Sequence, residues 1–323
     1  MNRSVLARER GLWIACYVWS MRARLITAFA AVYLVWGSTY LAIRFAVETL
    51  PPLLMAGARF VLAGTILLAW ARIREGAAAP SRVEWRTGLI SGTLLLLGGN
   101  GGVAWAEQRV PSGVAALLVA VVPLWMVLLG WLRPGGRRPR MPVFVGVGIG
   151  LAGLGLLVGP DAIKHGGTDT MGALVLILAS LSWAAGSLYI QWAPRAASGT
   201  VASGTQMLAG GLVLLIAGVV AHEPSHLDLA HASTRSLLGF AYLVTIGSLI
   251  GFTAYLYLLA HTTAAKAATY AYVNPVVAVF LGWAIGHEVV TSRTIVAAAI
   301  ILAGVAIITI TRESATVSPR AAR

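Results

Sequence analysis

One stretch of the chain has the spacing of a zinc-peptidase motif. His222, Glu223 and His226 fit the pattern H-E-x-x-H, in which two histidines one helical turn apart bind Zn²⁺ and the glutamate serves as general base. The pattern requires a helix, and Pro224 falls inside it, within a short connection between apolar segments. We therefore expect no metal site and no catalytic residue here, and we expect the chain to be no enzyme and to need no cofactor.

Arg59 and Glu107 are a second candidate, for charge recognition rather than catalysis. Arg59 is the one lysine or arginine clearly inside a long apolar segment, where a charge is costly unless it is paired or reaches water. Glu107 ends another apolar segment at a similar depth. The two could form a charge pair that serves as a gate or binds a charged substrate. Alternatively, Arg59 extends to water without a partner.

Aromatic and uncharged polar residues recur at helical spacing in the apolar segments. Trp36 and Tyr40 are four residues apart, and Trp183 and Ser187 repeat this spacing in a later segment. Residues four apart share one face of a helix, and such a face would be wasted against lipid. We predict that these faces and similar residues elsewhere line a substrate cavity. The predicted set is Trp36, Ser38, Tyr40, Asn100, Trp183, Ser187, Tyr189, Tyr270 and Asn274.

Glycine and proline mark weak points in these segments. Four glycines surround Asn100, each disfavouring helix by up to ~1 kcal/mol relative to alanine. They could serve close helix packing, but we favour exposure of backbone to substrate, because an amide in an apolar segment requires a reason. Pro123 and Pro275 each remove a backbone N–H in mid-segment. We predict hinges at both prolines, with simple packing kinks as the alternative.

The two prolines belong to a long internal repeat. Pro123, Gly130 and Trp131 recur as Pro275, Gly282 and Trp283, all at an offset of 152 residues. Shorter echoes are Gly-Ser-x-Tyr at 37–40 and 186–189, and Leu-Ala-Gly at 151–153 and 302–304. Two homologous halves of this kind are typical of membrane transporters with a site between the halves.

Composition places the chain in a membrane. Hydrophobic residues make up 58% of 323 and charged residues 11%, against about 45–50% and about 25% in soluble domains. The apolar residues form ten segments near the ~20 residues that a membrane-spanning helix needs, and a helix satisfies its own backbone there. The predicted spans are residues 25–44, 53–71, 87–106, 112–132, 142–159, 171–191, 200–221, 236–259, 266–286 and 294–311.

The basic residues predict the orientation. Of the 24 lysines and arginines, 18 lie on the side of the two termini, five lie on the opposite side, and Arg59 lies within a span. This bias places both termini in the cytoplasm, and it accounts for the net charge of +13 without a nucleic-acid partner. Five spans per half make the second half enter from the opposite side, so the repeat is inverted. The predicted units are a cytoplasmic extension (1–24), two five-helix repeats (25–159 and 171–311) and a cytoplasmic tail (312–323).

The first 24 residues do not fit a span. Their apolar stretch, residues 12–19, is too short to cross a bilayer. We expect a disordered or interfacial extension, with Met21 as an alternative first residue. Cys16 is the only cysteine, so no disulfide can form within the chain.

Several short motifs form a joint pattern along the chain. They are 36–40 (WGSTY), 51–52 (PP), 58–60 (ARF), 106–108 (AEQ), 110–113 (VPSG), 182–189 (SWAAGSLY) and 270–279 (YAYVNPVVAV). Taken together, they resemble the EamA-type drug/metabolite transporters, in particular their YedA-like bacterial inner-membrane branch. The resemblance implies ten helices in inverted repeats, a central cavity and export of small metabolites or drug-like compounds. Members commonly carry a Gly-Glu pair after the fourth and the ninth helix; this chain keeps His287-Glu288 after the ninth but has Leu-Arg-Pro-Gly at 132–135 after the fourth.

These observations predict an all-α protein of the bacterial inner membrane that works as a secondary transporter. We expect it to export small, amino-acid-like metabolites or drug-like compounds by alternating access, with protons or a counter-substrate as candidate coupling partners. The alternatives are an uncoupled facilitator or exchanger and, from another class, a membrane receptor or structural protein. Its other partner is the lipid bilayer, and it is a monomer or a homodimer.

Overall fold

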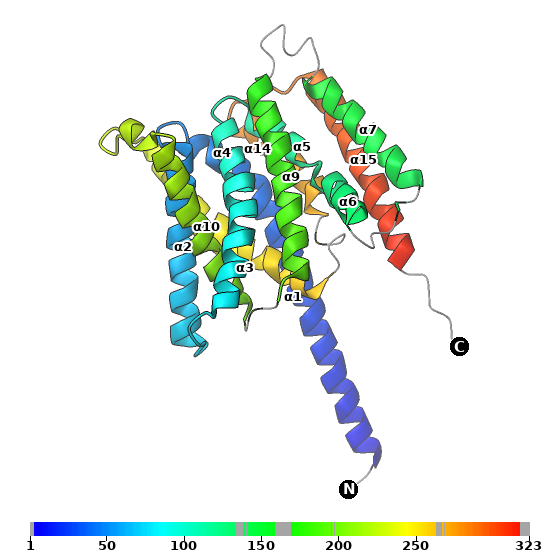
Figure 1. Cartoon of the computed structure of the whole chain (residues 1–323). Coiled ribbons are helices and arrows are strands. Elements are labelled where there is room, and N and C mark those ends of the chain that lie inside the picture. Colours follow the sequence, from blue (N-terminus) through cyan, green and yellow to red (C-terminus); the bar gives the residue numbers. More distant parts are fainter. Residues whose placement is uncertain are drawn as a thin grey trace.

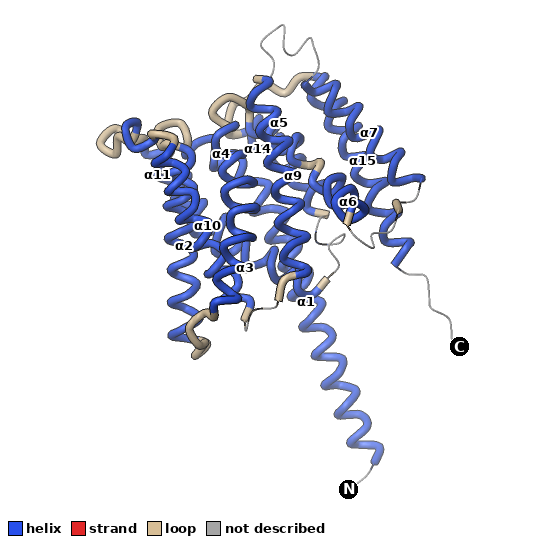
Figure 2. Tube along the Cα trace, in the orientation of Figure 1, coloured by secondary structure: helices blue, strands red, loops and turns tan. Residues whose placement is uncertain are grey.

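The structure, a computed structural model, describes residues 3–133, 138–139, 141–158, 169–194, 196, 198–262, 267 and 269–316; of 3–22, 271–272 and 308–316 it describes the backbone alone. All regular structure in these residues is helical (Figure 2). The helices are α1 (Arg3–Ala46), α2 (Pro52–Arg74), α3 (Arg82–Gly92), η1 (Thr93–Gly101), α4 (Gly102–Ala106), α5 (Ser112–Val119), α6 (Val122–Leu132), α7 (Met141–Val158), α9 (Thr170–Trp192), α10 (Gly199–Val220), η2 (Glu223–His226), α11 (Thr234–Tyr242), η3 (Leu243–Phe252), α12 (Thr253–His261), α14 (Tyr270–Ala284) and α15 (Ser292–Thr316).

Seven helical segments of the described chain are long and apolar enough to cross a membrane, and three shorter helices are also apolar. Several segments combine elements that follow one another without a loop, such as α3, η1 and α4. The all-α membrane class predicted from the sequence is therefore confirmed. The seven are Ala23–Ala46, Pro52–Arg74, Arg82–Ala106, Ser112–Leu132, Thr170–Trp192, Gly199–Val220 and Thr234–His261, and the shorter three are Met141–Leu157, Val273–Ala284 and Ser292–Ile307.

The N-terminal extension is helical, so the disordered alternative of the sequence-based expectation is wrong, while the interfacial alternative stays a prediction. Residues 3–24 continue the first span as one helix, α1, which projects from the lower end of the bundle (Figure 1). The reason is local: this stretch contains five arginines and three alanines, which favour helix, with one glycine and no proline. Nothing in its sequence therefore stops the helix before the first span.

The two halves of the sequence are interleaved in space. α2 packs along α10 at one side of the bundle, and α7 packs along α15 at the other (Figure 1). Between these pairs, α1 packs against α14 and η3, while α9 packs against α6 and η1. Each of these contacts joins an element from before residue 160 to one from after it, so neither half forms a separate core.

Two π-helices interrupt the long helical rods at matching places in the sequence. η1 lies between α3 and α4, and η3 lies between α11 and α12. In a π-helix each backbone hydrogen bond spans one extra residue, and such turns are frequent at functional sites. The glycine cluster around Asn100 thus widens its helix without breaking it. The sequence predicted a weakened helix around Asn100 but neither π-helix, and the glycines of the second, Gly247 and Gly251, are further apart.

The two repeated prolines have different local structures. α5 ends at Val119 and α6 begins at Val122, so Pro123 lies in the first turn of α6, where its missing N–H leaves no helical hydrogen bond unmade. Pro275 lies inside the continuous helix α14. The first proline therefore separates two helices, whereas the second is accommodated within one.

Candidate substrate site

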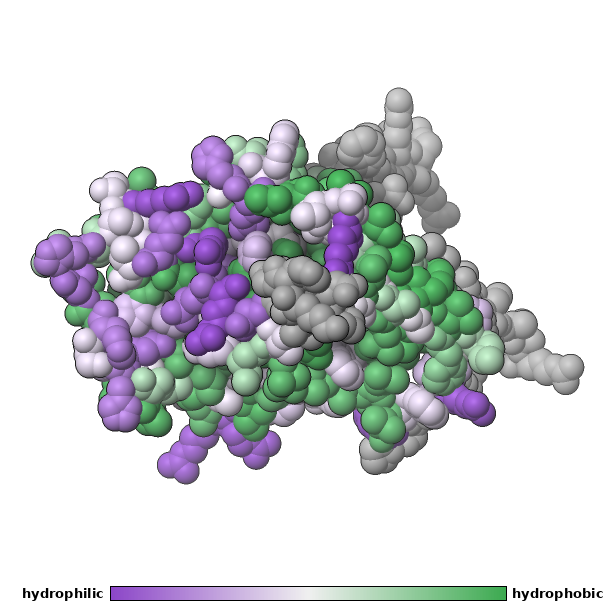
Figure 3. Space-filling model, turned by 90° about the horizontal axis from the view of Figure 1, so that it is seen from above, coloured by the Kyte–Doolittle hydropathy of each residue, from purple (hydrophilic) through white to green (hydrophobic). Residues whose placement is uncertain are grey.

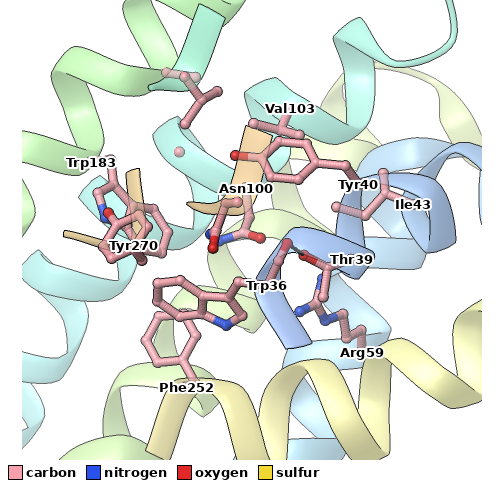
Figure 4. Close-up of a pocket in the computed structure, with 14 residues that line it drawn as sticks. Trp36, Thr39, Tyr40, Ile43, Arg59, Asn100, Val103, Trp183, Phe252 and Tyr270 are labelled. Atoms are coloured by element: carbon pink, nitrogen blue, oxygen red, sulfur yellow. Dashed lines mark hydrogen bonds between the residues drawn. The ribbon is translucent and has the colours of Figure 1, made fainter. Parts of the chain in front are cut away.

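A cavity lies near the middle of the bundle, between elements of both halves (Figure 4). Its volume is about 60 Å³, well below the ~300–1,000 Å³ that small-molecule sites occupy, so the cavity must widen before it can hold a ligand larger than a few water molecules. Most of the wall is apolar or aromatic, with one cation and a few uncharged polar groups. The lining residues are Trp36, Thr39, Tyr40, Ile43, Arg59, Gly99, Asn100, Val103, Val119, Ala179, Trp183, Phe252, Tyr270 and Asn274.

Trp36 of α1 is the centre of the aromatic wall. Its ring centroid lies 5.3 Å from Trp183, 4.7 Å from Tyr255 and 5.3 Å from Tyr270, and Phe252 lies 5.6 Å away. These tilted and edge-on arrangements are the favoured ones for aromatic pairs. Around this side chain of α1 therefore meet α9, α14 and the continuous rod formed by η3 and α12.

Two glycines of the π-helices make room for the two tryptophans. A Cβ at Gly99 of η1 would lie 2.8 Å from the Trp183 ring, and a Cβ at Gly251 of η3 would lie 2.6 Å from the Trp36 indole nitrogen. Both distances are well inside van der Waals contact, so each tryptophan packs directly on glycine backbone. A glycine of the first half thus packs on a tryptophan of the second half, and a glycine of the second half packs on a tryptophan of the first.

Hydrogen bonds hold the polar residues around the cavity. In the amide orientation that satisfies both neighbours, the Asn274 nitrogen donates to the backbone carbonyls of Tyr270 (3.2 Å) and Tyr33 (3.1 Å). The Asn100 nitrogen makes only a long bond of 3.4 Å to the Leu95 carbonyl. Asn274 is therefore held by backbone, whereas Asn100 retains hydrogen-bonding capacity toward the cavity.

Six of the nine predicted cavity residues line it: Trp36, Tyr40, Asn100, Trp183, Tyr270 and Asn274. Ser38 instead bonds to the Tyr242 hydroxyl (2.7 Å). Ser187 lies behind the wall, where it bonds to the Tyr255 hydroxyl (2.9 Å) and positions that ring. Tyr189 is half-buried and is not part of the lining.

Phe252 is the aromatic lining residue that sequence reasoning missed. It forms a pair at helical spacing with Tyr255 in the same rod, three residues apart, and this spacing was the available signal. The remaining unpredicted lining residues are small or aliphatic, apart from Thr39. Such residues carry no sequence signal that separates a cavity wall from ordinary packing.

The Arg59–Glu107 pair predicted from the sequence is not formed in this structure. Arg59 is 3% exposed and turns into the cavity, where its Nε donates to Ser248 Oγ at 2.7 Å. Glu107 is fully buried, and neither of its carboxylate oxygens has a hydrogen-bond partner. Its backbone carbonyl accepts a hydrogen bond from Arg44. The guanidinium of Arg59 and the carboxylate of Glu107 therefore do not meet. A similar position along two spans does not fix the direction in which their side chains point.

Comparison with known proteins identifies the family of this chain. A sequence model described as the EamA-like transporter family matches residues 24–159 and 170–310. The chain belongs to the EamA-like transporter family. The uncharacterized inner membrane transporter YedA of Escherichia coli K12 is 41% identical over 287 residues, which cover 88% of this chain and 90% of YedA. The uncharacterized transporter YoaV of Bacillus subtilis is 24% identical, over 87% of this chain and 95% of its own length.

The fold of this EamA-like protein also occurs in a solved crystal structure. That structure superposes with a TM-score of 0.61 over 90% of this chain and 98% of the other, at 20% sequence identity. At this identity the likeness concerns the fold alone. The chain thus shares its family with proteins named as transporters, and its described residues form apolar helices long enough to cross a membrane.

Two glutamates hold the upper end of this EamA-like fold together. Glu223 accepts hydrogen bonds from the backbone N–H groups of Leu53 (3.1 Å) and Leu54 (2.8 Å), at the start of α2. Glu288 does the same for Ser112 (2.8 Å) and Gly113 (3.1 Å), at the start of α5. Free N–H groups and the helix dipole make a helix N-terminus a favourable partner for a carboxylate. Each glutamate thus ties the second half of the chain to the first.

The histidine before each glutamate has an unusual backbone. His222 and His287 are the non-glycine residues of the described chain with positive φ, at 59° and 54°. The left-handed conformation turns the chain sharply and directs the next side chain back to the bundle. In the stretch that fits the zinc-peptidase pattern, both carboxylate oxygens of Glu223 are therefore engaged by α2.

Removing either cap charge should destabilise the fold. Glu223→Gln and Glu288→Gln should each lower the free energy of unfolding by about 1.5–3 kcal/mol, because charge-assisted hydrogen bonds to the helix start are lost. The matched control is Glu48→Gln, whose partner Arg235 is 3.4 Å away at the surface and which should cost under about 1 kcal/mol. Thermal unfolding in detergent measures the relative stability of the three variants. Equal unfolding midpoints for all three would contradict the capping role.

The face of the protein at this end is not uniform. Seen from above, hydrophilic side chains gather over the side that carries α2, α10 and α11, and hydrophobic residues border them (Figure 3). Arg235 and Glu48 belong to the elements that meet there. A polar end of this kind suits contact with water beyond the apolar part of the bundle.

Proposed function

We propose that this EamA-like protein is a secondary transporter of the bacterial inner membrane that exports small metabolites or drug-like compounds through the central cavity. The observation that carries the proposal is the cavity itself. It lies between helices of both halves, it is lined by aromatic rings, and it contains polar groups at a depth where they would be costly without a ligand or water. No lining residue belongs to a cluster that could cut a bond, so we propose binding and passage rather than catalysis.

The proposed architecture is ten transmembrane helices in two inverted five-helix repeats, residues 25–159 and 171–311. Reciprocal contacts support it. Glu223, after α10, binds the start of α2, while Glu75, after α2, accepts a hydrogen bond of 2.6 Å from Thr200 at the start of α10. Likewise, Gly99 packs on Trp183 and Gly251 packs on Trp36. Exchange of the halves converts each contact into the other, as an axis in the membrane plane requires.

Alternating access follows from this symmetry. If the halves exchange conformations, the cavity opens first to one side and then to the other. Pro123, in the first turn of α6, and Pro275, inside α14, are the proposed hinges. The coupling partner is a proton or a counter-substrate, and the protein is a monomer or a homodimer. An uncoupled facilitator or exchanger would use the same cavity, whereas a receptor or structural protein would not need one.

The proposed topology has both termini in the cytoplasm, with residues 1–24 and 312–323 as cytoplasmic extensions. It predicts that cysteines introduced at the exposed positions Arg138 and Asp228, in a variant without Cys16, will be labelled from opposite sides. An impermeant maleimide added to intact cells should modify the cysteine at 228 and spare the one at 138. Labelling of position 138 in intact cells would contradict the orientation.

Transport itself is tested with the purified chain in proteoliposomes. A panel of labelled metabolites and drug-like compounds should include at least one that crosses faster than in empty liposomes. A dependence on an imposed proton gradient would identify proton coupling, acceleration by substrate on the far side would identify exchange, and neither effect would identify a facilitator. If no panel member crosses faster than in empty liposomes, the receptor or structural alternative gains support.

A further inference from the structure

Arg59 is a buried cation without an acidic partner. It lies on α2, and Nε is the one guanidinium nitrogen that makes a hydrogen bond in the described part of the protein, to Ser248 Oγ. The ion pairs of that part lie elsewhere: Arg109–Asp169, His231–Asp228 and Arg235–Glu48. Arginine keeps its charge and carries five N–H donors. Its two terminal nitrogens therefore have donors to offer at the cavity wall.

The guanidinium is held in one position. A Cβ at Gly247 of η3 would lie 3.1 Å from the Arg59 terminal nitrogen Nη2 and 3.1 Å from the Thr39 methyl group, so the group fits between α1, α2 and η3. Its carbon lies 4.5 Å from the Phe60 ring centroid. Figure 4 shows its nitrogens directed toward Thr39 and Trp36. This fixation lowers the entropy cost of binding an anion there.

The rest of the cavity offers donors and aromatic faces but no acid. Trp183 Nε1 is buried and lies close to the hydroxyl groups of Tyr255 and Tyr270, with no acceptor at full hydrogen-bond geometry in the described structure. Trp36, Phe252 and Tyr270 supply ring surface. An ammonium group would find no carboxylate among the lining residues, whereas an anion would find Arg59.

We infer that the transported substrate is an organic monocarboxylate with an uncharged apolar or aromatic body, and that the terminal nitrogens of Arg59 bind its carboxylate. The inference rests on the proposed transport function. A guanidinium matches a carboxylate with two parallel hydrogen bonds, and the pair forms where both charges are shielded from water. The substrate would thus supply the anion that the protein does not place beside Arg59, while its body packs on the aromatic wall.

Binding to the detergent-solubilised full chain, measured by isothermal titration calorimetry, tests this independently of transport. The probes are 3-phenylpropionate, its uncharged amide 3-phenylpropionamide, and the cation phenethylamine. The carboxylate should bind at least about tenfold more tightly than either relative. Arg59→Gln should weaken carboxylate binding by roughly 10- to 150-fold, the equivalent of a charge-assisted hydrogen bond, while leaving amide binding unchanged.

Two variants make the test specific. Arg59→Lys keeps the charge but loses the two-pronged geometry, so it should retain tighter binding than Arg59→Gln. Arg72→Gln removes an exposed arginine from the lower end of the same helix, where it bonds to the Ala77 carbonyl, and it should bind like the unmodified chain. Thermal unfolding of each variant shows that it is folded.

The outcomes separate this inference from the proposed function. Absence of carboxylate binding, equal binding of the amide or the amine, or full affinity in folded Arg59→Gln would overturn the inference. Binding that follows the predicted order but is never accompanied by transport in proteoliposomes would support the carboxylate site and reject the transporter. Transport of panel compounds with no preference for carboxylates would support the transporter and reject the carboxylate site.

Discussion

Replacing Gly64 with leucine should abolish the packing of α2 against α10. A Cβ at this position would lie 2.5 Å from the backbone nitrogen of Leu208 and 2.9 Å from the carbonyl oxygen of Gly204. Because the obstruction is backbone, no side-chain rotation can relieve it. Tight contact through small residues is also what holds helices together in a bilayer. We expect a loss at or beyond the ~1–3 kcal/mol typical of overpacking, with aggregation during purification.

The matched control is Gly148→Leu. A Cβ at Gly148 on α7 would have no atom within 4 Å, so the side chain should extend into the surroundings at little cost. Size-exclusion chromatography and thermal unfolding in detergent compare the two variants, with Gly64→Ala as the intermediate case. A monodisperse Gly64→Leu protein with an unchanged unfolding midpoint would show that α2 and α10 are not packed as described.

Replacing Trp36 with alanine should impair both stability and transport. The indole contacts four aromatic rings from three other rods, and its removal leaves a large void, at a cost of about 3–5 kcal/mol for tryptophan truncation in a core. It also removes one wall of the cavity, so substrate affinity should fall at least about tenfold. Trp36→Phe should preserve part of both properties, because it keeps an aromatic ring.

Trp70→Ala is the control for this prediction. Trp70 lies on α2, is 53% exposed and is not part of the cavity lining. Its truncation should change the unfolding midpoint and the transport rate only slightly. If Trp36→Ala and Trp70→Ala behaved alike in both measurements, the central aromatic cluster would have no special role.

Sequence reasoning was most successful where a single helix carried the information. Trp36 and Tyr40 share a face of α1 by their spacing, and the structure places both on the cavity. Asn100, which also lines the cavity, was predicted for a different reason, as a polar amide within a glycine-rich apolar segment. Prediction from spacing failed for Ser38 and Tyr189, which belong to the same kind of motif, because spacing defines a face of a helix but not which neighbouring helix covers it.

Contacts between segments far apart in the chain could not be predicted from the sequence. Glu223 was considered through its resemblance to a zinc motif, yet its partners are the N–H groups of Leu53 and Leu54, some 170 residues earlier in the chain. Arg59 and Glu107 were joined because their depths agree, but one is directed to Ser248 and the other is not paired. Side-chain direction depends on packing between helices, which a single sequence does not encode in a readable pattern.

The central claim is that the cavity is a passage that opens alternately to the two sides of the membrane. Val119 lines the cavity and its neighbour Leu118 is fully buried outside it, and Cys16 is the single native cysteine. In a chain with Cys16→Ala, a cysteine at Val119 should therefore react with an impermeant thiol reagent that enters the cavity. A cysteine at Leu118 is the control.

The decisive measurement is the rate of this labelling from each side of sealed vesicles. Alternating access predicts that Val119→Cys reacts with the reagent from both sides and that a bound substrate slows both reactions. Leu118→Cys should react from neither side. Reaction of Val119→Cys from one side only, unchanged by substrate and by imposed gradients, would contradict alternating access through this cavity.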